Sequence, residues 1–95
     1  MKCKQRGSAI IFECPACECL HSVYVAHPQE PINWKWNGSY ASPTFHPSIL
    51  VNGKAGFLNP ALPRCHFFVV DGKIQYLSDC SHPYAGQTVD LPEMD

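Results

Sequence analysis

The sequence predicts a small all-β domain, in which a bound metal ion stabilises an antiparallel sheet. Nine prolines and six glycines divide the chain into short pieces, and no stretch keeps a helical apolar period over three turns. Several short runs instead alternate between apolar and polar residues, as half-buried strands do. A C-x-x-C pair, Cys14 and Cys17, is typical of a zinc knuckle.

Length and composition favour one folded domain over residues 1–95. A chain of 95 residues has no room for a second core, and a core this small gains stability from a bound metal. With 45% apolar and 16% charged residues, the chain is globular rather than disordered. Its net charge of −1 disfavours a dedicated nucleic-acid binder, because phosphate contacts need many unopposed Lys and Arg side chains.

The first half of the chain contains three predicted strands. They are expected at residues 8–13, 20–26 and 32–36. In the second of these, alternation places His21, Val23 and Val25 on one face, which we expect to be partly buried. Residues 42–47 are not expected to form a central strand, because Pro43 and Pro47 cannot donate to a ladder.

The second half contains the clearest local signal, a β-hairpin. Asp71-Gly72 separates two β-rich runs, and this dipeptide favours a two-residue turn. The other predicted segments are a short strand at 48–51, a loop at 52–64, and an edge strand at 87–91. The turn predicts four cross-strand pairs: Val70 with Lys73, Val69 with Ile74, Phe67 with Tyr76, and Cys65 with Ser78. Alternation then places Cys65, Phe67, Val69, Ile74 and Tyr76 on the core face.

The hairpin also suggests which residues complete a Zn²⁺ site. Cys80 follows the second hairpin strand and should emerge on the same side as Cys65. The simplest closed tetrahedral set is therefore Cys14, Cys17, Cys65 and Cys80. His66, His82 and His21 are alternative ligands. Cys3 and Cys19 have no partner at a spacing typical of metal ligands, so we expect them to be free thiols.

Two further interpretations of these residues remain open. Six cysteines could form three disulfides, but no secretory signal is visible and a reducing cytoplasm keeps thiols free for metals. His21, His66, His82 and Asp79 could also converge and hold a catalytic metal or move a proton. A structural role for each histidine is favoured, since none belongs to a spaced pair such as H-E-x-x-H. G-x-S-x-G and phosphate-loop motifs are absent from the sequence.

The chain resembles a family of small proteins, mostly from phages and prophages, whose function is unassigned and some of which are labelled ammonia monooxygenase. The motifs that support the resemblance are C-P-A-C, W-K-W-N-G, P-T-F-H-P-S-I, C-H-F-F, D-G-K-I, D-C-S-H and A-G-Q-T-V. Together they span about three quarters of the chain. The resemblance implies an intracellular zinc-binding protein of phage or prophage origin, and it implies no reaction. Nothing in the sequence resembles a copper or diiron oxygenase.

The sequence thus favours a cytoplasmic zinc protein that acts by binding another macromolecule, and a host or phage protein is the partner we expect. Trp34 and Trp36 would contribute to a binding surface if they are exposed, although core packing is the more common fate of such residues. A metal-dependent, hydrolase-like enzyme that uses His21, His66 and His82 is the second hypothesis. A nucleic-acid-binding zinc protein is the third.

Overall fold

The computed structural model describes residues 1–52 and 63–94, and within these residues all regular structure is β-strand. The strands are β1 (Cys3–Arg6), β2 (Ala9–Cys14), β3 (Cys19–Tyr24), β4 (Lys35–Trp36), β5 (Phe45–Val51), β6 (Cys65–Val70), β7 (Lys73–Tyr76) and β8 (Thr88–Asp90). The predicted all-β antiparallel class is confirmed. The loop predicted at 52–64 lies mostly outside the described residues. No helix in the described part is long and apolar enough to span a membrane.

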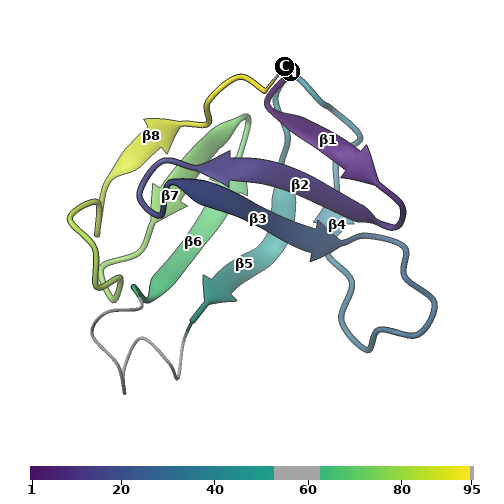
Figure 1. The fold of residues 1–95 in the computed structure, drawn as a ribbon, viewed down its shortest axis with the longest axis horizontal. Coiled ribbons are helices and arrows are strands. Elements are labelled where there is room, and N and C mark those ends of the chain that lie inside the picture. Colours follow the sequence, from purple (N-terminus) through teal and green to yellow (C-terminus); the bar gives the residue numbers. More distant parts are fainter. Residues whose placement is uncertain (53–62, 95) are drawn as a thin grey trace.

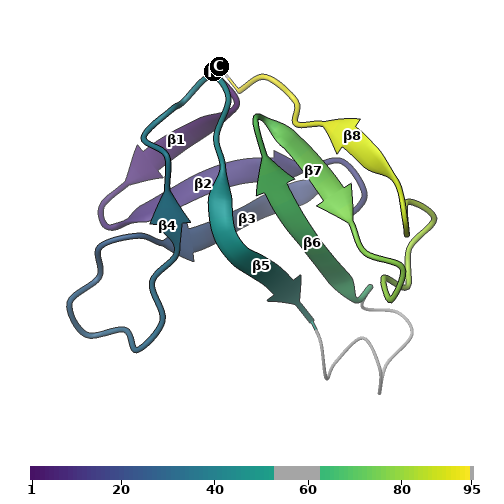
Figure 2. The same ribbon diagram turned by 180° about the vertical axis from the view of Figure 1, so that it is seen from behind.

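The strands form two antiparallel sheets that lie one over the other. The smaller sheet has the order β1-β2-β3 and the larger has the order β4-β5-β6-β7-β8. Figure 1 shows the smaller sheet in front, and Figure 2 shows the larger one from the opposite side, with the two chain termini close together. Met94 N–H donates to the carbonyl of Met1 at 2.7 Å, which ties the two ends to each other.

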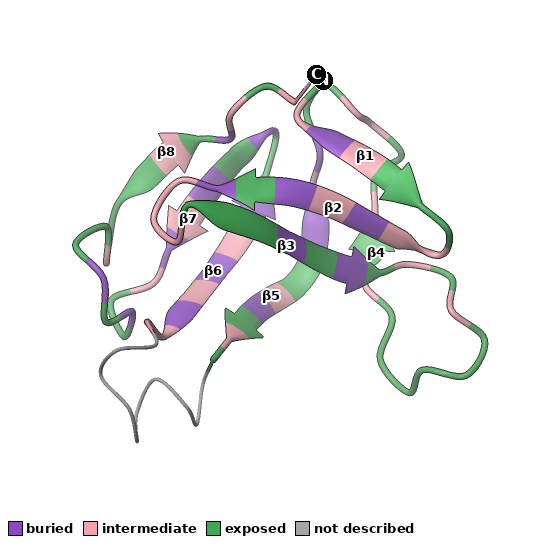
Figure 3. Cartoon of the chain, in the orientation of Figure 1, coloured by how far each residue is buried: buried purple, intermediate pink, exposed green. Residues whose placement is uncertain are grey.

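Aromatic rings fill the space between the sheets. Phe12 of β2 packs against Phe45 of β5 and Phe67 of β6, with ring centroids 5.6 and 5.9 Å apart. All three rings are fully buried. Burying such side chains contributes about 1.5–3 kcal/mol each, so this cluster contributes substantially to the apolar contact between the two sheets. Buried and partly buried positions alternate along β6, as the strand period requires (Figure 3).

The predicted C-terminal hairpin is confirmed in register and in turn geometry. Val70 pairs with Lys73, Val69 with Ile74 and Phe67 with Tyr76. Asp71 and Gly72 both have positive φ values, 50° and 76°, as a type I′ turn demands. A side chain at Gly72 would also meet the backbone of Ser42 at 3.2 Å. The predicted pair of Cys65 with Ser78 lies beyond the end of β7 at Tyr76.

The structure corrects the strand predictions in three places: one strand was not predicted, one is shorter than predicted, and one prediction was wrong. β1 was missed, because its polar residues resemble a fraying terminus, although Cys3 is fully buried. Of the strand predicted at 32–36 only Lys35–Trp36 pairs, and Ile32 is 59% exposed. Residues 42–47 were expected to stay outside any central strand, but β5 begins at Phe45 and lies between β4 and β6. A register shift between Phe45 and Ile49 accommodates the proline of this segment.

Candidate functional site

A serine, a histidine and an aspartate form a hydrogen-bonded chain on the larger sheet. Ser48 Oγ lies 3.3 Å from Nε2 of His66. On the other side of the ring, His66 Nδ1 lies 3.0 and 3.2 Å from the two carboxylate oxygens of Asp79. A carboxylate can only accept hydrogen bonds, so Nδ1 carries the proton and donates it to Asp79. The lone pair of Nε2 therefore faces the hydroxyl of Ser48.

Strand pairing places Ser48 and His66 on the same face. β5 and β6 are antiparallel, and Leu50 stands opposite His66. Because side chains alternate along a strand, Ser48 points to the same side as Leu50, two residues further on. The neighbours of His66 in β6, Cys65 and Phe67, are fully buried. His66 and Ser48 therefore lie on the outer face of the larger sheet, away from the core.

The segment after β7 brings Asp79 to the imidazole, and Cys80 anchors this segment. The Cys80 thiol donates to the carbonyl of His66 at 3.1 Å and accepts from the His66 N–H at 3.2 Å. Leu77 N–H donates to the same carbonyl at 2.8 Å. Both backbone polar groups of His66 are thus bonded to the segment that contains Asp79, which fixes the carboxylate relative to the ring.

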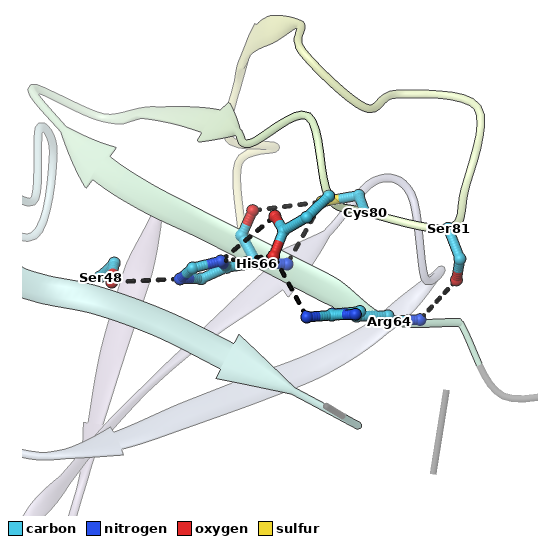
Figure 4. Close-up of polar contacts among 6 residues, drawn as sticks. Ser48, Arg64, His66, Cys80 and Ser81 are labelled. Atoms are coloured by element: carbon cyan, nitrogen blue, oxygen red, sulfur yellow. Dashed lines mark hydrogen bonds and ion pairs between the residues drawn. The ribbon is translucent and has the colours of Figure 1, made fainter. Parts of the chain in front are cut away.

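Arg64 is the other charged neighbour of Asp79. Its guanidinium lies 3.5 Å from a carboxylate oxygen, and its backbone N–H donates to Ser81 Oγ at 2.7 Å. Figure 4 shows Ser48 and Arg64 on opposite sides of the His66 ring. The hydrogen bond from His66 holds the pKa of Asp79 below its usual value, and the Arg64 charge lowers it further. Asp79 is therefore an anion at neutral pH.

The chemistry that such a chain supports is acyl transfer. An imidazole that accepts from a serine hydroxyl can remove its proton, and a carboxylate on the other ring nitrogen fixes the tautomer and stabilises the imidazolium. A separation of 3.3 Å between the serine oxygen and the imidazole nitrogen is within the range of resting enzymes. The side chain of His66 is 25% exposed, so a reactant can reach it from solvent.

A second cluster lies on the opposite, buried side of β6. Cys14, Cys17, His21 and Cys65 each offer one ligand atom, and these atoms all lie within 4.8 Å of one another. The group could hold a metal ion. Cys14 ends β2 and Cys17 lies in the turn that follows, while His21 belongs to β3 and Cys65 begins β6. The cluster thus joins the β2–β3 turn of the smaller sheet to the larger sheet.

Two side chains surround this cluster. The hydroxyl of Tyr76 lies 3.2 Å from Cys14 Sγ and accepts from the Ala16 N–H at 3.2 Å. His82 Nε2 lies 3.3 Å from Cys65 Sγ, and its Nδ1 accepts from the Tyr84 N–H. Because Nδ1 of His82 is an acceptor, the ring proton is on Nε2, which donates to the sulfur. Burial lowers the pKa of His82 and so favours this neutral ring.

The thiols of the cluster differ in their ionisation. The contact with the Cys65 thiol lowers the pKa of Cys14 to about 3, and burial raises that of Cys17 to about 12. Two effects raise the pKa of Cys65: the contact with Cys14, which is the larger, and burial. The contacts among the three sulfurs therefore make the first proton easier to remove from this group than from an isolated thiol.

The structure brings together three of the four residues predicted as metal ligands, with His21 as the fourth member. Cys80 contacts the backbone of His66 instead, and His66 faces Ser48 and Asp79 on the outer side of the sheet. Cys3 and Cys19 also lie outside the group. All six cysteines are free thiols, so the structure contains none of the three disulfides considered as an alternative.

The comparison with protein families gives a match over residues 1–77. The matching family is BubE, described as a bacterial ubiquitination-like system serine protease. The chain belongs to the BubE family. The matched part of the chain contains Ser48, His66 and all four residues of the Cys/His cluster, and it ends two residues before Asp79. No match was found among curated proteins. None was found among solved structures.

The BubE match refines the resemblance described from the sequence. A small family of unassigned function was expected, and the matching model describes a bacterial family with a named system. An origin in a phage or prophage stays a prediction.

Ser48 was not among the candidate functional residues predicted from the sequence. The residue lies in a Pro-Ser-Ile context without the glycines of a nucleophile elbow. His66 and Asp79 were considered together, but in a group with His21 and His82 that would hold a metal or move a proton. The missing signal is the pairing of β5 with β6, which places a serine beside the histidine. If these two strands had been assumed to pair antiparallel, the contact between Ser48 and His66 would have been expected.

Proposed function

We propose that the protein is a serine protease of a bacterial ubiquitination-like system, with Ser48 as nucleophile, His66 as general base and Asp79 as the residue that orients the imidazole. The observation that supports this most directly is the chain of contacts from Ser48 Oγ through both nitrogens of His66 to the Asp79 carboxylate. The family description supplies the reaction class and the system. The two lines of support are independent, because the contacts come from geometry alone.

The proposed reaction proceeds by acyl transfer in two halves. Ser48 Oγ attacks the carbonyl carbon of the scissile bond while His66 Nε2 takes its proton. The imidazolium then protonates the leaving amine as the carbon–nitrogen bond breaks, and an ester on Ser48 remains. Water attacks this ester with His66 again as base, which releases the carboxylic acid and restores the Ser48 hydroxyl. Asp79 stays ionised throughout and stabilises the imidazolium.

Under this proposal, the protein partner expected from the sequence has a different role. A host or phage protein bound by the chain would be its substrate, and the outer face of the larger sheet would be the binding surface. Leu50 stands on this face and is 51% exposed beside His66, so an apolar contact with the substrate is available next to the nucleophile. A cytoplasmic location, expected from the free thiols, stays a prediction.

The alternative of a metal-dependent enzyme that uses His21, His66 and His82 has less support. His66 is directed toward Ser48 and Asp79, whereas His21 and His82 both lie near Cys65 on the buried side of β6. The three imidazoles therefore do not converge on one ion. The net charge of −1 gives no support to nucleic-acid binding.

Labelling with a fluorophosphonate tests the proposal. An activated Ser48 displaces fluoride from phosphorus and forms a stable phosphonate ester, while an ordinary serine hydroxyl reacts far more slowly. We expect mass spectrometry to locate one label on Ser48. Ser48→Ala and His66→Gln should both abolish labelling, and Ser22→Ala, on the other sheet, should leave it unchanged. A protein that stays unlabelled, or a label on Ser81 beside Arg64, would overturn the assignment.

A further inference from the structure

We propose that Cys14, Cys17, His21 and Cys65 form a closed, structural Zn²⁺ site that joins the two sheets. The proposal does not depend on the assignment of Ser48. It concerns the buried side of β6, where three sulfurs and one imidazole nitrogen lie within 4.8 Å of one another. Zinc favours this combination of soft sulfur and nitrogen ligands in a tetrahedral arrangement.

The spacing of the sulfurs fits zinc better than it fits a disulfide. Cys14 Sγ and Cys65 Sγ lie 3.9 Å apart. Zn–S bonds of about 2.3 Å at tetrahedral angles place two sulfurs about 3.8 Å apart. A disulfide requires about 2.05 Å between the same atoms. The two thiols are thus already at the edge length of a zinc tetrahedron.

His21 provides an independent observation. Its Nε2 is buried and has no hydrogen-bond partner among the described residues. Buried polar atoms almost always have a partner, because losing water without replacing its hydrogen bond costs about 1–3 kcal/mol per group. The ring packs in a fixed orientation, stacked on Phe67 with centroids 5.7 Å apart. A metal ion at the centre of the cluster would supply the missing partner of Nε2.

His82 is excluded from the ligand set by its own hydrogen bonds. The Tyr84 N–H occupies Nδ1, so Nε2 carries the proton that points at Cys65 Sγ at 3.3 Å. A protonated nitrogen cannot bind a metal, but it stabilises a coordinated thiolate. His82 is therefore assigned as a supporting donor. With four ligands from the protein, the site has no open position, which is characteristic of structural zinc.

The site would hold together parts of the chain that are far apart in sequence. The C-x-x-C knuckle and His21 belong to the β2–β3 hairpin, and Cys65 belongs to the larger sheet. Cys65 also directly precedes His66 in β6. A metal bound here would fix the start of β6 against the smaller sheet. Such a crosslink adds more to the stability of a small domain than to that of a large one, because a small core buries less apolar surface.

Metal analysis of the purified protein tests the inference. We expect about one zinc per chain and, after exchange with Co²⁺, the d–d and thiolate charge-transfer bands of a tetrahedral sulfur-rich site. Cys14→Ser, Cys65→Ser and His21→Gln should lose the metal or bind it far more weakly. Matched controls come from the same residue types: Cys19→Ser and Cys80→Ser should retain it, while His82→Gln removes only a supporting donor and should weaken binding less than His21→Gln does.

Two further outcomes keep the test decisive if the ligand variants fail to fold. Wild-type protein treated with a chelator should unfold, and added Zn²⁺ should restore its circular dichroism spectrum. A wild-type protein that contains no zinc and gives no tetrahedral Co²⁺ spectrum would overturn the proposal. Loss of zinc from Cys80→Ser or His82→Gln, as complete as that from Cys14→Ser, would overturn the ligand set. Fluorophosphonate labelling of Ser48 is scored separately, so either proposal can fail without the other.

Discussion

Cys65 and His66 are consecutive residues of β6, yet they belong to two different sites. Cys65 is fully buried and joins the Cys/His cluster between the sheets. His66 faces the other way and contacts Ser48 and Asp79. The alternation of a β-strand makes this arrangement possible, because adjacent side chains point to opposite faces. One strand therefore connects the proposed catalytic base to the proposed metal site through a single peptide bond.

The first prediction concerns the role of Asp79. Asp79→Asn removes the acceptor charge, so the imidazole loses its preferred tautomer, and we expect kcat for a p-nitrophenyl ester to fall on the order of 10³–10⁴-fold. KM should change less than about threefold, since the carboxylate contacts the base rather than the substrate. Asp90→Asn is the matched control, because Asp90 pairs with Lys73, beside the turn of the β6–β7 hairpin, and not with His66. Equal rates for the Asp79→Asn variant and the wild type would contradict the assignment.

The second prediction separates the two roles considered for Cys80. In the structure its sulfur bonds to both backbone groups of His66. Cys80→Ala removes these bonds, so His66 is held less firmly. If this raises the activation free energy by about 1.4 kcal/mol, kcat falls about tenfold. Cys80→Ser should recover much of the rate, because a hydroxyl also donates and accepts. Neither change should alter the zinc content measured by elemental analysis. A drop in zinc would return Cys80 to the ligand set.

The sequence was sufficient for local features and insufficient for contacts between distant strands. Asp71-Gly72 predicted the hairpin register correctly, because the turn type and the alternation are both local properties. Alternation also predicted that His21 and Val23 are buried on one face, as observed. Neither pattern contains information about which strand lies beside which. The contact of Ser48 with His66 depends on the pairing of β5 with β6 across a long connection.

The residues of the Cys/His cluster could be predicted only in part, for the same reason. The C-x-x-C spacing identifies Cys14 and Cys17 as a pair, and the hairpin places Cys65 on the core side. The choice between Cys80 and His21 depends on how the β2–β3 hairpin packs on the larger sheet. In that packing His21 stacks on Phe67 and its ring reaches the sulfurs. No sequence period encodes this contact.

The third prediction concerns the contact between the sheets. The ring of Phe12 packs on Phe45 and Phe67 at the centre of the core. Phe12→Leu removes part of this contact, and we expect the free energy of unfolding to fall by about 1–3 kcal/mol. Leu20→Ala, at an exposed position of β3, should change it by less than about 0.5 kcal/mol. Urea unfolding of both variants in excess zinc measures the difference. Similar midpoints would show that Phe12 is not central to the packing.

The last prediction concerns Tyr76, whose hydroxyl supports the proposed zinc site. The hydroxyl contacts Cys14 Sγ and also accepts from the Ala16 N–H, so it connects a ligand with the backbone of the knuckle. Tyr76→Phe keeps the buried ring and removes both hydrogen bonds. Partners of this kind contribute about 10–100-fold to metal affinity, so we expect zinc to bind more weakly by that factor. Competition with a chromophoric chelator measures the affinity directly.

Tyr84→Phe is the control for this change, because Tyr84 stacks on Tyr76 with centroids 5.8 Å apart while its own ring is partly exposed. The control should bind zinc as the wild type does. If both variants bind zinc equally well, the Tyr76 hydroxyl does not support a coordinated Cys14. If instead only Tyr76→Phe weakens binding, the loss is assigned to the hydroxyl rather than to ring packing. The hydrogen bond from Tyr76 then joins β7 to the knuckle through a metal ligand, which explains why a tyrosine rather than a phenylalanine is suited to this buried position.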